Sequence, residues 1–322
     1  MQKIENISTN KSFIKQENII SFLKTKKKSL PTKYLYDDLG SKLFEEICDT
    51  EEYYLTRTEK EILDEYSKDI ILKSGVKEFF ELGGGASKKT KVLLQESLKN
   101  NIPLTYSSLD ISDKALKMSF DELKNVSKNL NIKLYNGDFI NDLNNLNLSD
   151  SPRLYLFLGS TLGNFDDELA IKFLSNLSRI MKKKDCFLLG VDKIKDEKVI
   201  VSAYNDKSGF TKKFNKNILN VVNKKYNLNF KEGNFNHNAE FNTEKSQIEM
   251  NLESIIDQNI MLPNDESISI NSGEKILTEI SRKFSDSTIN MLFSKASLKV
   301  VNHYNDKKKY FSLYLLKSNQ YS

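Results

Sequence analysis

The 322-residue chain has few of the residues on which several classes of enzyme depend. Its histidines are His237 and His303, and its cysteines are Cys48 and Cys186. A zinc site of the usual spacing needs a cluster of such residues, so we expect no metal. A Ser-His-Asp triad would need one of these histidines, and no G-x-S-x-G motif supplies the serine. The composition argues against metal-dependent and nucleophilic catalysis, and it leaves chemistry that needs neither, such as methyl transfer.

Arginine is also scarce, and long apolar runs are absent. The net charge of +5 comes almost wholly from lysine, because the arginines are only Arg57, Arg153, Arg179 and Arg282. Nucleic-acid readers rely on arginine for bidentate contacts, so we predict no nucleic-acid partner. No apolar stretch suits a membrane span, and residues 1–10 lack the apolar core of a secretory signal. With two cysteines, the sequence predicts a reduced, cytoplasmic protein.

A glycine-rich turn, Gly83-Gly84-Gly85, is the centre of the chain's organisation. An apolar run precedes it, and a helical pattern follows to Leu98, with Ser87 as the expected N-cap. Glycines let the backbone approach a ligand closely, and a helix start offers free N–H groups. The turn has neither the G-x-G-x-x-G nor the G-K-[ST] spacing. We therefore favour a nucleoside cofactor without a pyrophosphate, and S-adenosylmethionine is the common one.

The pattern of alternating strands and helices continues to Asp192. Further strands are predicted at 104–109, 132–135, 154–158 and 187–191. Asp110 ends the first of these and is placed to bind ribose hydroxyls. Asp138 and Phe139 follow the next strand, where they could hold an adenine edge and cover its face. Ligands bind at the carboxyl ends of strands in open α/β sheets, so this edge is the predicted site.

The pattern changes outside this region. An amphipathic helix is predicted at 13–23, Ser41 and Thr58 are expected to begin the next two helices, and Asp286 a late one. Two helices (196–206 and 211–226) and the alternating segments 247–252 and 267–270 do not fit a βαβ unit, so we interpret them as an insertion. The runs 298–304 and 310–316 form a hairpin around 305–309.

Five parallel strands finished by an antiparallel hairpin are the architecture of a class I, Rossmann-like methyltransferase, so we predict this α/β fold. We assign residues 61–195 and 286–322 to the methyltransferase core. Residues 1–60 and 196–285 form a second, discontinuous, substrate-binding domain over the cofactor cleft. The N-terminal loops of that domain are rich in tyrosine, which is typical either of a buried core or of a pocket wall.

Four segments stand out for their sequence and their order: LYDDLGSKLFEEI at 35–47, EYYLTRTE at 52–59, FLGSTLGN at 157–164 and LTEISRKF at 277–284. Together they resemble the histidine-specific N-α-methyltransferases of ergothioneine biosynthesis. The resemblance runs from about residue 31 to 316. It implies a monomeric two-domain enzyme that uses S-adenosylmethionine to trimethylate the α-amino group of L-histidine, giving hercynine. The glycine turn departs from relatives, which often carry a serine and a threonine there.

The resemblance also implies roles for the matching residues. The methionine and ribose end of the cofactor would lie along Gly83, Gly85 and Lys89. Its ribose hydroxyls would bind Asp110, and its adenine would be held by Asp138 and Phe139. The substrate carboxylate would meet Asn164 and Tyr204, and the amine Asn164 and Tyr36, the expected catalytic pair. The pocket would be lined by Phe44, Tyr53, Gly159 and Thr161, and the imidazole would meet Met250, Glu279 and Ser281.

Several alternatives stay open. Glu279 could form a salt bridge to Arg282 or Lys283 on a strand face, and Met250 could be an ordinary core residue. The enzyme could methylate another amino acid, such as a tryptophan derivative, although an indole offers a single N–H donor and suits a wider, apolar wall. An RNA-modifying protein of the same fold is opposed by Gly159-Ser160-Thr161, which stands in place of an Asn-Pro-Pro-Tyr motif. An inactive S-adenosylmethionine-binding regulator would not need the substrate motifs.

Overall fold

The computed structural model describes residues 4–8, 19–99, 104–146, 148–262 and 266–321. These residues form two compact units. The first comprises the described parts of Met1–Thr9, Leu55–Ile194 and Lys283–Ser322, and the second those of Asn10–Tyr54 and Lys195–Arg282.

The predicted domain boundaries need correction at the N-terminus. Ile4–Asn6 was predicted to belong with residues 1–60 in the substrate-binding domain, but it forms strand β1, which pairs with β4 of the first unit. Helix α3 (Tyr54–Ser74) runs without a break across the predicted boundary at residue 60, so almost all of it belongs to the first unit. The assignment of the second unit to substrate binding stays a prediction.

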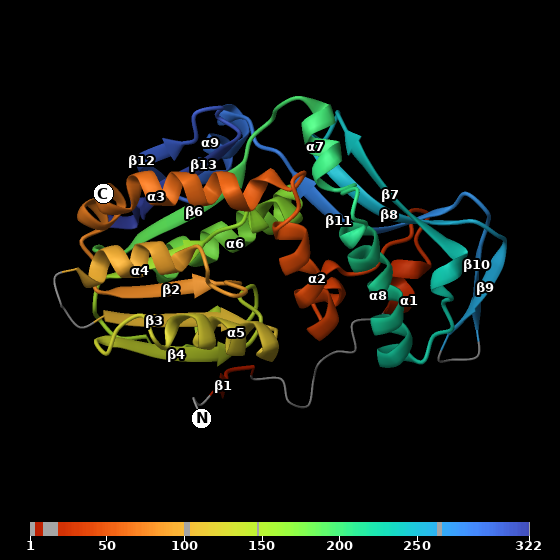
Figure 1. The fold of residues 1–322 in the computed structure, drawn as a ribbon, viewed down its shortest axis with the longest axis horizontal. Coiled ribbons are helices and arrows are strands. Elements are labelled where there is room, and N and C mark those ends of the chain that lie inside the picture. Colours follow the sequence, from red (N-terminus) through yellow and green to blue (C-terminus); the bar gives the residue numbers. More distant parts are fainter. Residues whose placement is uncertain (1–3, 9–18, 100–103, 147, 263–265, 322) are drawn as a thin grey trace. The chain divides into compact units, whose positions relative to one another are not determined.

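An eight-stranded sheet forms the first unit, in the order β1-β4-β3-β2-β5-β6-β13-β12 (Figure 1). Its strands are β1 (Ile4–Asn6), β2 (Glu78–Leu82), β3 (Leu104–Asp110), β4 (Leu130–Asn136), β5 (Arg153–Phe157), β6 (Cys186–Asp192), β12 (Leu298–Asn305) and β13 (Phe311–Ser318). Strands β1 to β6 pair in parallel, and β13 pairs antiparallel with both β6 and β12. The five predicted parallel strands and the hairpin are confirmed. Strand β1 was not predicted, because it is short and lies in a polar segment.

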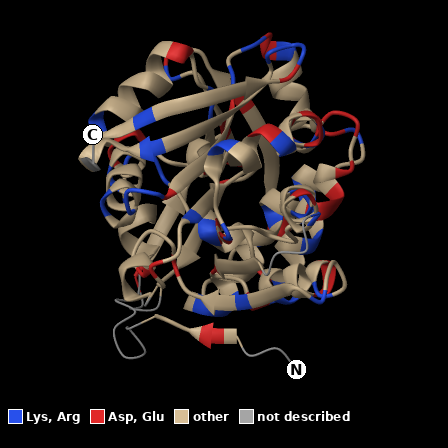
Figure 2. Cartoon of the chain, turned by 90° about the vertical axis from the view of Figure 1, so that its left-hand side faces the viewer, with Lys and Arg blue, Asp and Glu red and all other residues tan. Residues whose placement is uncertain are grey.

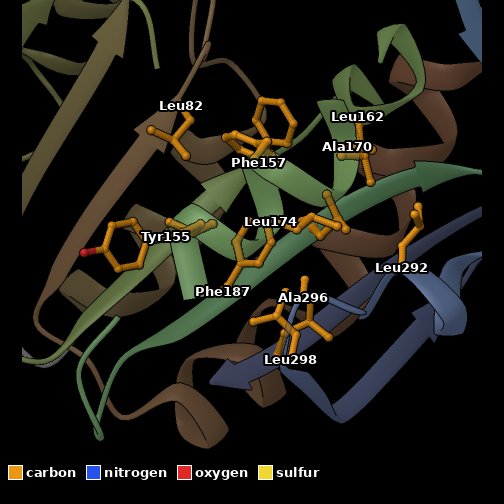
Figure 3. Packing of buried hydrophobic residues seen from close by; sticks show 14 of the residues in the cluster. Leu82, Tyr155, Phe157, Leu162, Ala170, Leu174, Phe187, Leu292, Ala296 and Leu298 are labelled. Carbon is orange, nitrogen blue, oxygen red and sulfur yellow. The ribbon is translucent and has the colours of Figure 1, made fainter. Parts of the chain in front are cut away.

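Helices cover both faces of this sheet, because successive side chains of a strand point to opposite faces. One face packs against α6 (Asp167–Ile180) and α9 (Asp286–Lys295) in a cluster that includes Phe157 and Phe187 (Figure 3). On the other face, Glu81 of β2 binds Thr90 at the start of α4 (Thr90–Leu98), and Gly190 of β6 lies against Glu59 of α3. Helix α5 (Asp113–Leu123) packs on β3 and β4.

The predicted helix starts at Thr58 and Asp286 are wrong. Thr58 lies inside α3, which already begins at Tyr54. The N-cap of α9 is Ser285 instead of Asp286, because the Ser285 hydroxyl accepts a hydrogen bond from the backbone N–H of Thr288 at 3.1 Å. Asp286 occupies the first turn, where a carboxylate interacts favourably with the helix dipole.

The second unit combines helices with two small antiparallel sheets. Its helices are α1 (Ile19–Leu23), α2 (Asp38–Cys48), α7 (Glu197–Ala203) and α8 (Phe210–Tyr226). Its strands are β7 (Phe235–Asn242), β8 (Gln247–Ser254), β9 (Gln258–Met261), β10 (Ser267–Ile270) and β11 (Lys275–Arg282), in sheets ordered β11-β8-β7 and β10-β9. The predicted helices and alternating strands of the insertion are confirmed. The predicted helix at 13–23 is seen from residue 19, and its earlier part lies outside the described residues.

Short 3₁₀ helices complete the chain: η1 (Thr32–Leu35), η2 (Leu143–Asn145), η3 (Thr161–Asn164), η4 (Glu232–Asn234) and η5 (Asn319–Tyr321). None of the helices in the described residues combines the length and the apolar character that crossing a bilayer requires. Figure 2 shows Lys and Arg beside Asp and Glu along the same helices and loops. The absence of a nucleic-acid partner stays a prediction.

Candidate active site

The strand order of the first unit reverses between β2 and β5, because β3 and β4 continue from β2 on one side and β6 continues from β5 on the other. In open α/β sheets, ligands bind outside the carboxyl ends of the strands at such a switch point. The structure brings to this edge the residues Gly83, Gly85 and Lys89 after β2, Asp110 at the end of β3, Asp138 and Phe139 after β4, and Gly159, Thr161 and Asn164 after β5.

Glycine is needed at the turn after β2 for two reasons. Gly83 and Gly85 have φ values of 64° and 54°, which residues other than glycine rarely adopt. A Cβ atom added to Gly83 would also lie 3.2 Å from the ring of Phe139, whereas one added to Gly85 would meet nothing within 4 Å. The turn therefore lies against Phe139 on one side and is open at Gly85.

A buried carboxylate, Glu81, supports the turn from behind. It accepts hydrogen bonds from the hydroxyls of Ser87 (2.8 Å), Thr90 and Tyr106. Burial raises the pKa of Glu81 in spite of these bonds. The prediction of Ser87 as N-cap is wrong, because its hydroxyl is used here and its φ of 53° is left-handed; Lys89 occupies the N-cap position. Sequence reasoning missed Glu81, because an acid inside an apolar run does not by itself show which hydroxyls will surround it.

Asp110 connects the glycine turn to the end of β3. Its carboxylate accepts a hydrogen bond from the backbone N–H of Ser112 at 2.8 Å, and the N–H groups of Gly85 and Ile111 also donate to it. Burial outweighs these hydrogen bonds and raises the pKa of Asp110 to about 6. The carboxylate is thus mostly ionised at neutral pH and retains lone pairs that could accept hydroxyl donors.

Asp138 and Phe139 form the corner after β4. The Asp138 carboxylate accepts hydrogen bonds from the backbone N–H of Ile140 (2.9 Å) and the amide of Asn141 (2.7 Å). The ring of Phe139 packs edge-on against Phe157, with centroids 5.4 Å apart. The aromatic side chain is therefore held between the core and the glycine turn, next to a carboxylate of fixed orientation.

Two consecutive left-handed residues shape the loop after β5. Gly159 has a φ of 75° and Ser160 a φ of 59°. The Ser160 hydroxyl accepts a hydrogen bond from the backbone N–H of Asp192 at 2.9 Å, and the Thr161 hydroxyl donates to the carbonyl of Leu158 at 3.0 Å. The half-buried Asn164 ends η3. The loop is thus held by one hydrogen bond to the end of β6 and one within its own backbone turn.

The predicted aromatic residues of the substrate site lie in the second unit, where they form a cluster. Its ring centroids are 5.7 Å apart for Tyr36 and Phe44, 6.1 Å for Phe44 and Tyr53, and 6.2 Å for Tyr53 and Tyr204. Phe214 of α8 also belongs to it, at 5.4 Å from Tyr36. Phe214 lies in the helix predicted at 211–226, and an apolar position on a helix carries no signal of a site.

A buried carboxylate lies beside this cluster. Glu279 is 6% exposed, and its Oε2 atom accepts a hydrogen bond from the hydroxyl of Tyr36 at 3.4 Å. Burial and the nearby charge of Glu279 raise the pKa of Tyr36 well above its usual value. Met250 is the direct partner of Glu279 in the β8–β11 ladder, next to a bulge in β11, so the two residues are cross-strand neighbours.

Tyr204 and Ser281 are also brought together. The hydroxyl of Tyr204 donates to the Ser281 hydroxyl oxygen at 2.7 Å. Lys283, an alternative partner that the sequence offered for Glu279, forms an ion pair with Asp192 in the first unit at 2.9 Å. The second unit therefore presents hydroxyls and one carboxylate within an aromatic surround, an arrangement suited to a small ring with N–H groups.

Residues 15–318 of the chain match the family described as "Histidine-specific methyltransferase, SAM-dependent". The chain is 34% identical over 280 residues to a histidine N-alpha-methyltransferase of Mycolicibacterium smegmatis. This alignment covers 87% of this chain and 87% of the relative. It is 32% identical over 301 residues to the protein of the same name from Mycobacterium tuberculosis. That alignment covers 93% of this chain and 94% of the relative.

Among solved structures, the fold resembles that of an S-adenosylmethionine-dependent methyltransferase from Clostridium acetobutylicum. The TM-score is 0.50 at 13% sequence identity, with 85% of this chain and 97% of the other covered. At this identity the likeness concerns the fold alone. It confirms the predicted class I, Rossmann-like architecture of the sheet.

Proposed function

Since the chain belongs to the family of S-adenosylmethionine-dependent, histidine-specific methyltransferases, we propose that it methylates the α-amino group of L-histidine. Three successive transfers give the trimethylated product, hercynine, in ergothioneine biosynthesis. The observation that carries the proposal is the family match over residues 15–318, because it spans segments of both units. We further propose that the enzyme acts as a monomer on this small-molecule substrate.

The first unit has residues that fit S-adenosylmethionine. Gly85 leaves open space at a left-handed turn, and Asp110 ends the neighbouring strand with an ionised carboxylate suited to ribose hydroxyls. Phe139 offers a ring face to an adenine and Asp138 an acceptor for its amino group, while Lys89 follows the turn. When bound, the cofactor supplies a methyl group on a sulfonium, which is transferred by in-line displacement.

Holding the substrate amine on the axis of that displacement is most of the chemical task. An α-amino group has a pKa of roughly 8 and must lose its proton before each transfer. Tyr36 stays protonated at neutral pH because its own pKa is raised, so it orients the amine by hydrogen bonding and does not act as a base. We propose that Asn164 supplies an amide oxygen acceptor to the same amine, and that protons leave to water.

Recognition of the imidazole is assigned to the second unit. Glu279 can accept the N–H of a neutral ring or pair with a charged one, which an apolar wall cannot do. Met250 and Ser281 would contact the ring on either side of this carboxylate on the β8 and β11 strands. Tyr204 would bind the substrate carboxylate, with Phe44, Tyr53, Gly159 and Thr161 as lining residues. This supports histidine over a tryptophan derivative, whose indole cannot take up a proton near neutral pH and pair with the carboxylate as a cation.

The test is a labelling experiment on the purified full chain. The protein is incubated with methyl-labelled S-adenosylmethionine and each standard amino acid in turn, and the product mass gives the number of methyl groups added. We expect label in histidine alone and a trimethylated product. Label in tryptophan or in transfer RNA instead of histidine would contradict the proposal.

A further inference from the structure

Glu59 is a buried acid to which none of the proposed roles refers. It lies on α3, and its side chain is 0% exposed. A Cβ atom added to Gly190, in the middle of β6, would lie 2.2 Å from the Oε1 atom of Glu59. A glycine in the interior of a central strand weakens the strand, and it often marks a position where another group must approach the backbone closely. The fold therefore makes specific room for this carboxylate.

The partners of Glu59 come from the two sides of the switch point. The backbone N–H of Gly159, directly after β5, lies 2.9 Å from each carboxylate oxygen. The ammonium of Lys89, which follows the glycine turn after β2, forms an ion pair with the same carboxylate. A Cβ atom on Gly159 would be 3.2 Å from the Lys89 Nζ atom. One carboxylate thus joins the two segments between which the strand order reverses.

Stability alone is a poor reason for such a pair. Removing a carboxylate and an ammonium from water is costly, and apolar residues of similar size often stabilise a fold equally well. What an apolar residue cannot do is bind a backbone N–H and an ammonium at once in fixed directions. The arrangement therefore points to a requirement for geometry at this edge of the sheet.

We infer that Glu59 is a positioning residue for S-adenosylmethionine. It acts through Lys89 and Gly159: it fixes the separation of the two segments and holds the Lys89 ammonium in one place before the cofactor arrives. The inference rests on the proposed function for the identity of the cofactor. It adds a residue outside the set that is expected to contact cofactor or substrate.

The test is Glu59→Gln, which keeps the size of the side chain and removes its charge. We expect the Kd for S-adenosylmethionine, measured by titration calorimetry, and the KM for the cofactor to rise at least about tenfold. We expect kcat at saturating cofactor to change by less than about threefold, because the chemical step does not use Glu59. Glu61→Gln on the same helix is the matched control, since Glu61 is exposed, and it should change neither quantity.

A merely structural role gives a different result. Destabilisation lowers the active fraction, so kcat would fall while the KM and Kd stayed at their wild-type values, and that outcome would overturn the inference. If Glu59→Gln does not fold, the double variant Glu59→Gln/Lys89→Met leaves no buried unpaired charge and replaces it. Wild-type cofactor affinity in the double variant would likewise overturn the inference. Failure of the wild-type protein to bind S-adenosylmethionine would instead contradict the proposed function.

Discussion

The hydroxyl of Tyr36 and the carboxylate of Glu279 show how burial decides what each group can do. Burial first, and the negative charge of Glu279 second, hold the pKa of Tyr36 far above neutrality. The tyrosine is therefore a permanent donor beside a carboxylate that lies in an aromatic surround. A substrate N–H can replace or share this hydrogen bond, so a ring that carries an N–H donor suits the site.

Glu279→Ala is expected to weaken histidine binding by about 2–4 kcal/mol, because the substrate N–H then has no charged acceptor in a buried site. Titration calorimetry with histidine, in the presence of S-adenosylhomocysteine, measures the effect. Glu244→Ala is the control, since Glu244 is exposed in the turn between β7 and β8. An unchanged histidine affinity in Glu279→Ala would show that the carboxylate does not meet the imidazole.

The pKa of Asp110 makes both the stability of the fold and the binding of the cofactor depend on pH. Its pKa of about 6 in the folded protein lies above the ordinary value of 3.8. The folded protein thus binds this proton more readily than the unfolded chain, and the group favours folding as the pH falls from about 6 toward 4. Cofactor binding should respond in the opposite sense, because a protonated carboxyl is a poorer acceptor for ribose hydroxyls.

We therefore expect the affinity for S-adenosylmethionine to decline as the pH falls through about 6, and the decline to be much smaller in Asp110→Asn. Calorimetric titrations between about pH 5 and 7.5 measure this. The asparagine variant should bind more weakly than wild type at neutral pH. A wild-type affinity that is flat across this range would show that Asp110 does not serve as the acceptor.

Which single residues could be anticipated from the sequence depended on where their partners lie. Asp110 was found because a strand end announces it. Glu59 and Glu81 were not found, since their importance comes from contacts that the fold creates: Glu59 and Gly159 are 100 residues apart along the chain. A lone acid in an apolar segment does not reveal whether it is exposed or held by hydroxyls and ammonium groups.

At the scale of elements, helix α2 depends on one glycine and one cap. A Cβ atom on Gly40 would lie 1.7 Å from the carbonyl oxygen of Leu35, so no other residue fits the first turn. Asp37 is the N-cap, accepting from the backbone N–H of Gly40 at 2.8 Å and from the amide of Asn217 at 2.7 Å. The prediction that Ser41 begins this helix is wrong, because Asp37 already performs that role.

Gly40→Ala is expected to destabilise the protein by at least about 2 kcal/mol, since the added methyl group must displace backbone atoms. Urea unfolding followed by circular dichroism measures the change. Gly233→Ala is the matched control, because a Cβ atom there would meet nothing within 4 Å. Equal stability of the two variants would contradict the close approach between Gly40 and Leu35.

The elements themselves were more predictable than their ends. Strands β5 and β6 are nearly continuous apolar runs and are buried along their whole length, which is typical of the central strands of a parallel sheet covered on both faces. The helix starts were harder, because several polar residues near each start can accept a backbone hydrogen bond. Only three-dimensional position decides among them, as Ser285 beside Asp286 illustrates.

At the scale of the whole molecule, the chain passes repeatedly between its two units, and a buried ion pair lies where it leaves and rejoins the sheet. The Nζ atom of Lys283, which follows β11, lies 2.9 Å from the Oδ2 atom of Asp192 at the end of β6, and both side chains are 0% exposed. The backbone N–H of Phe284 donates to the carbonyl of Asp192 at 2.8 Å. The pair and this hydrogen bond connect two segments that are distant in sequence.

Lys283→Met is expected to destabilise the protein by about 3–5 kcal/mol, because it removes the ammonium from a buried carboxylate. Urea unfolding measures this, and Asp192→Asn/Lys283→Met should recover part of the loss by removing both charges. Lys295→Met, at the end of α9 and exposed, is the control. If Lys283→Met unfolds like wild type, the pair contributes nothing to holding the segments together.

Lys193 forms an isolated β-bridge with Phe284, so the long segment between them departs from the sheet and returns to it at one spot. Circular permutation and domain insertion are tolerated where the two ends of a segment lie close together. We therefore expect that residues 195–282, exchanged together with residues 19–54 of the same unit, can be replaced by the corresponding segments of a relative while the sheet from β2 to β13 stays intact.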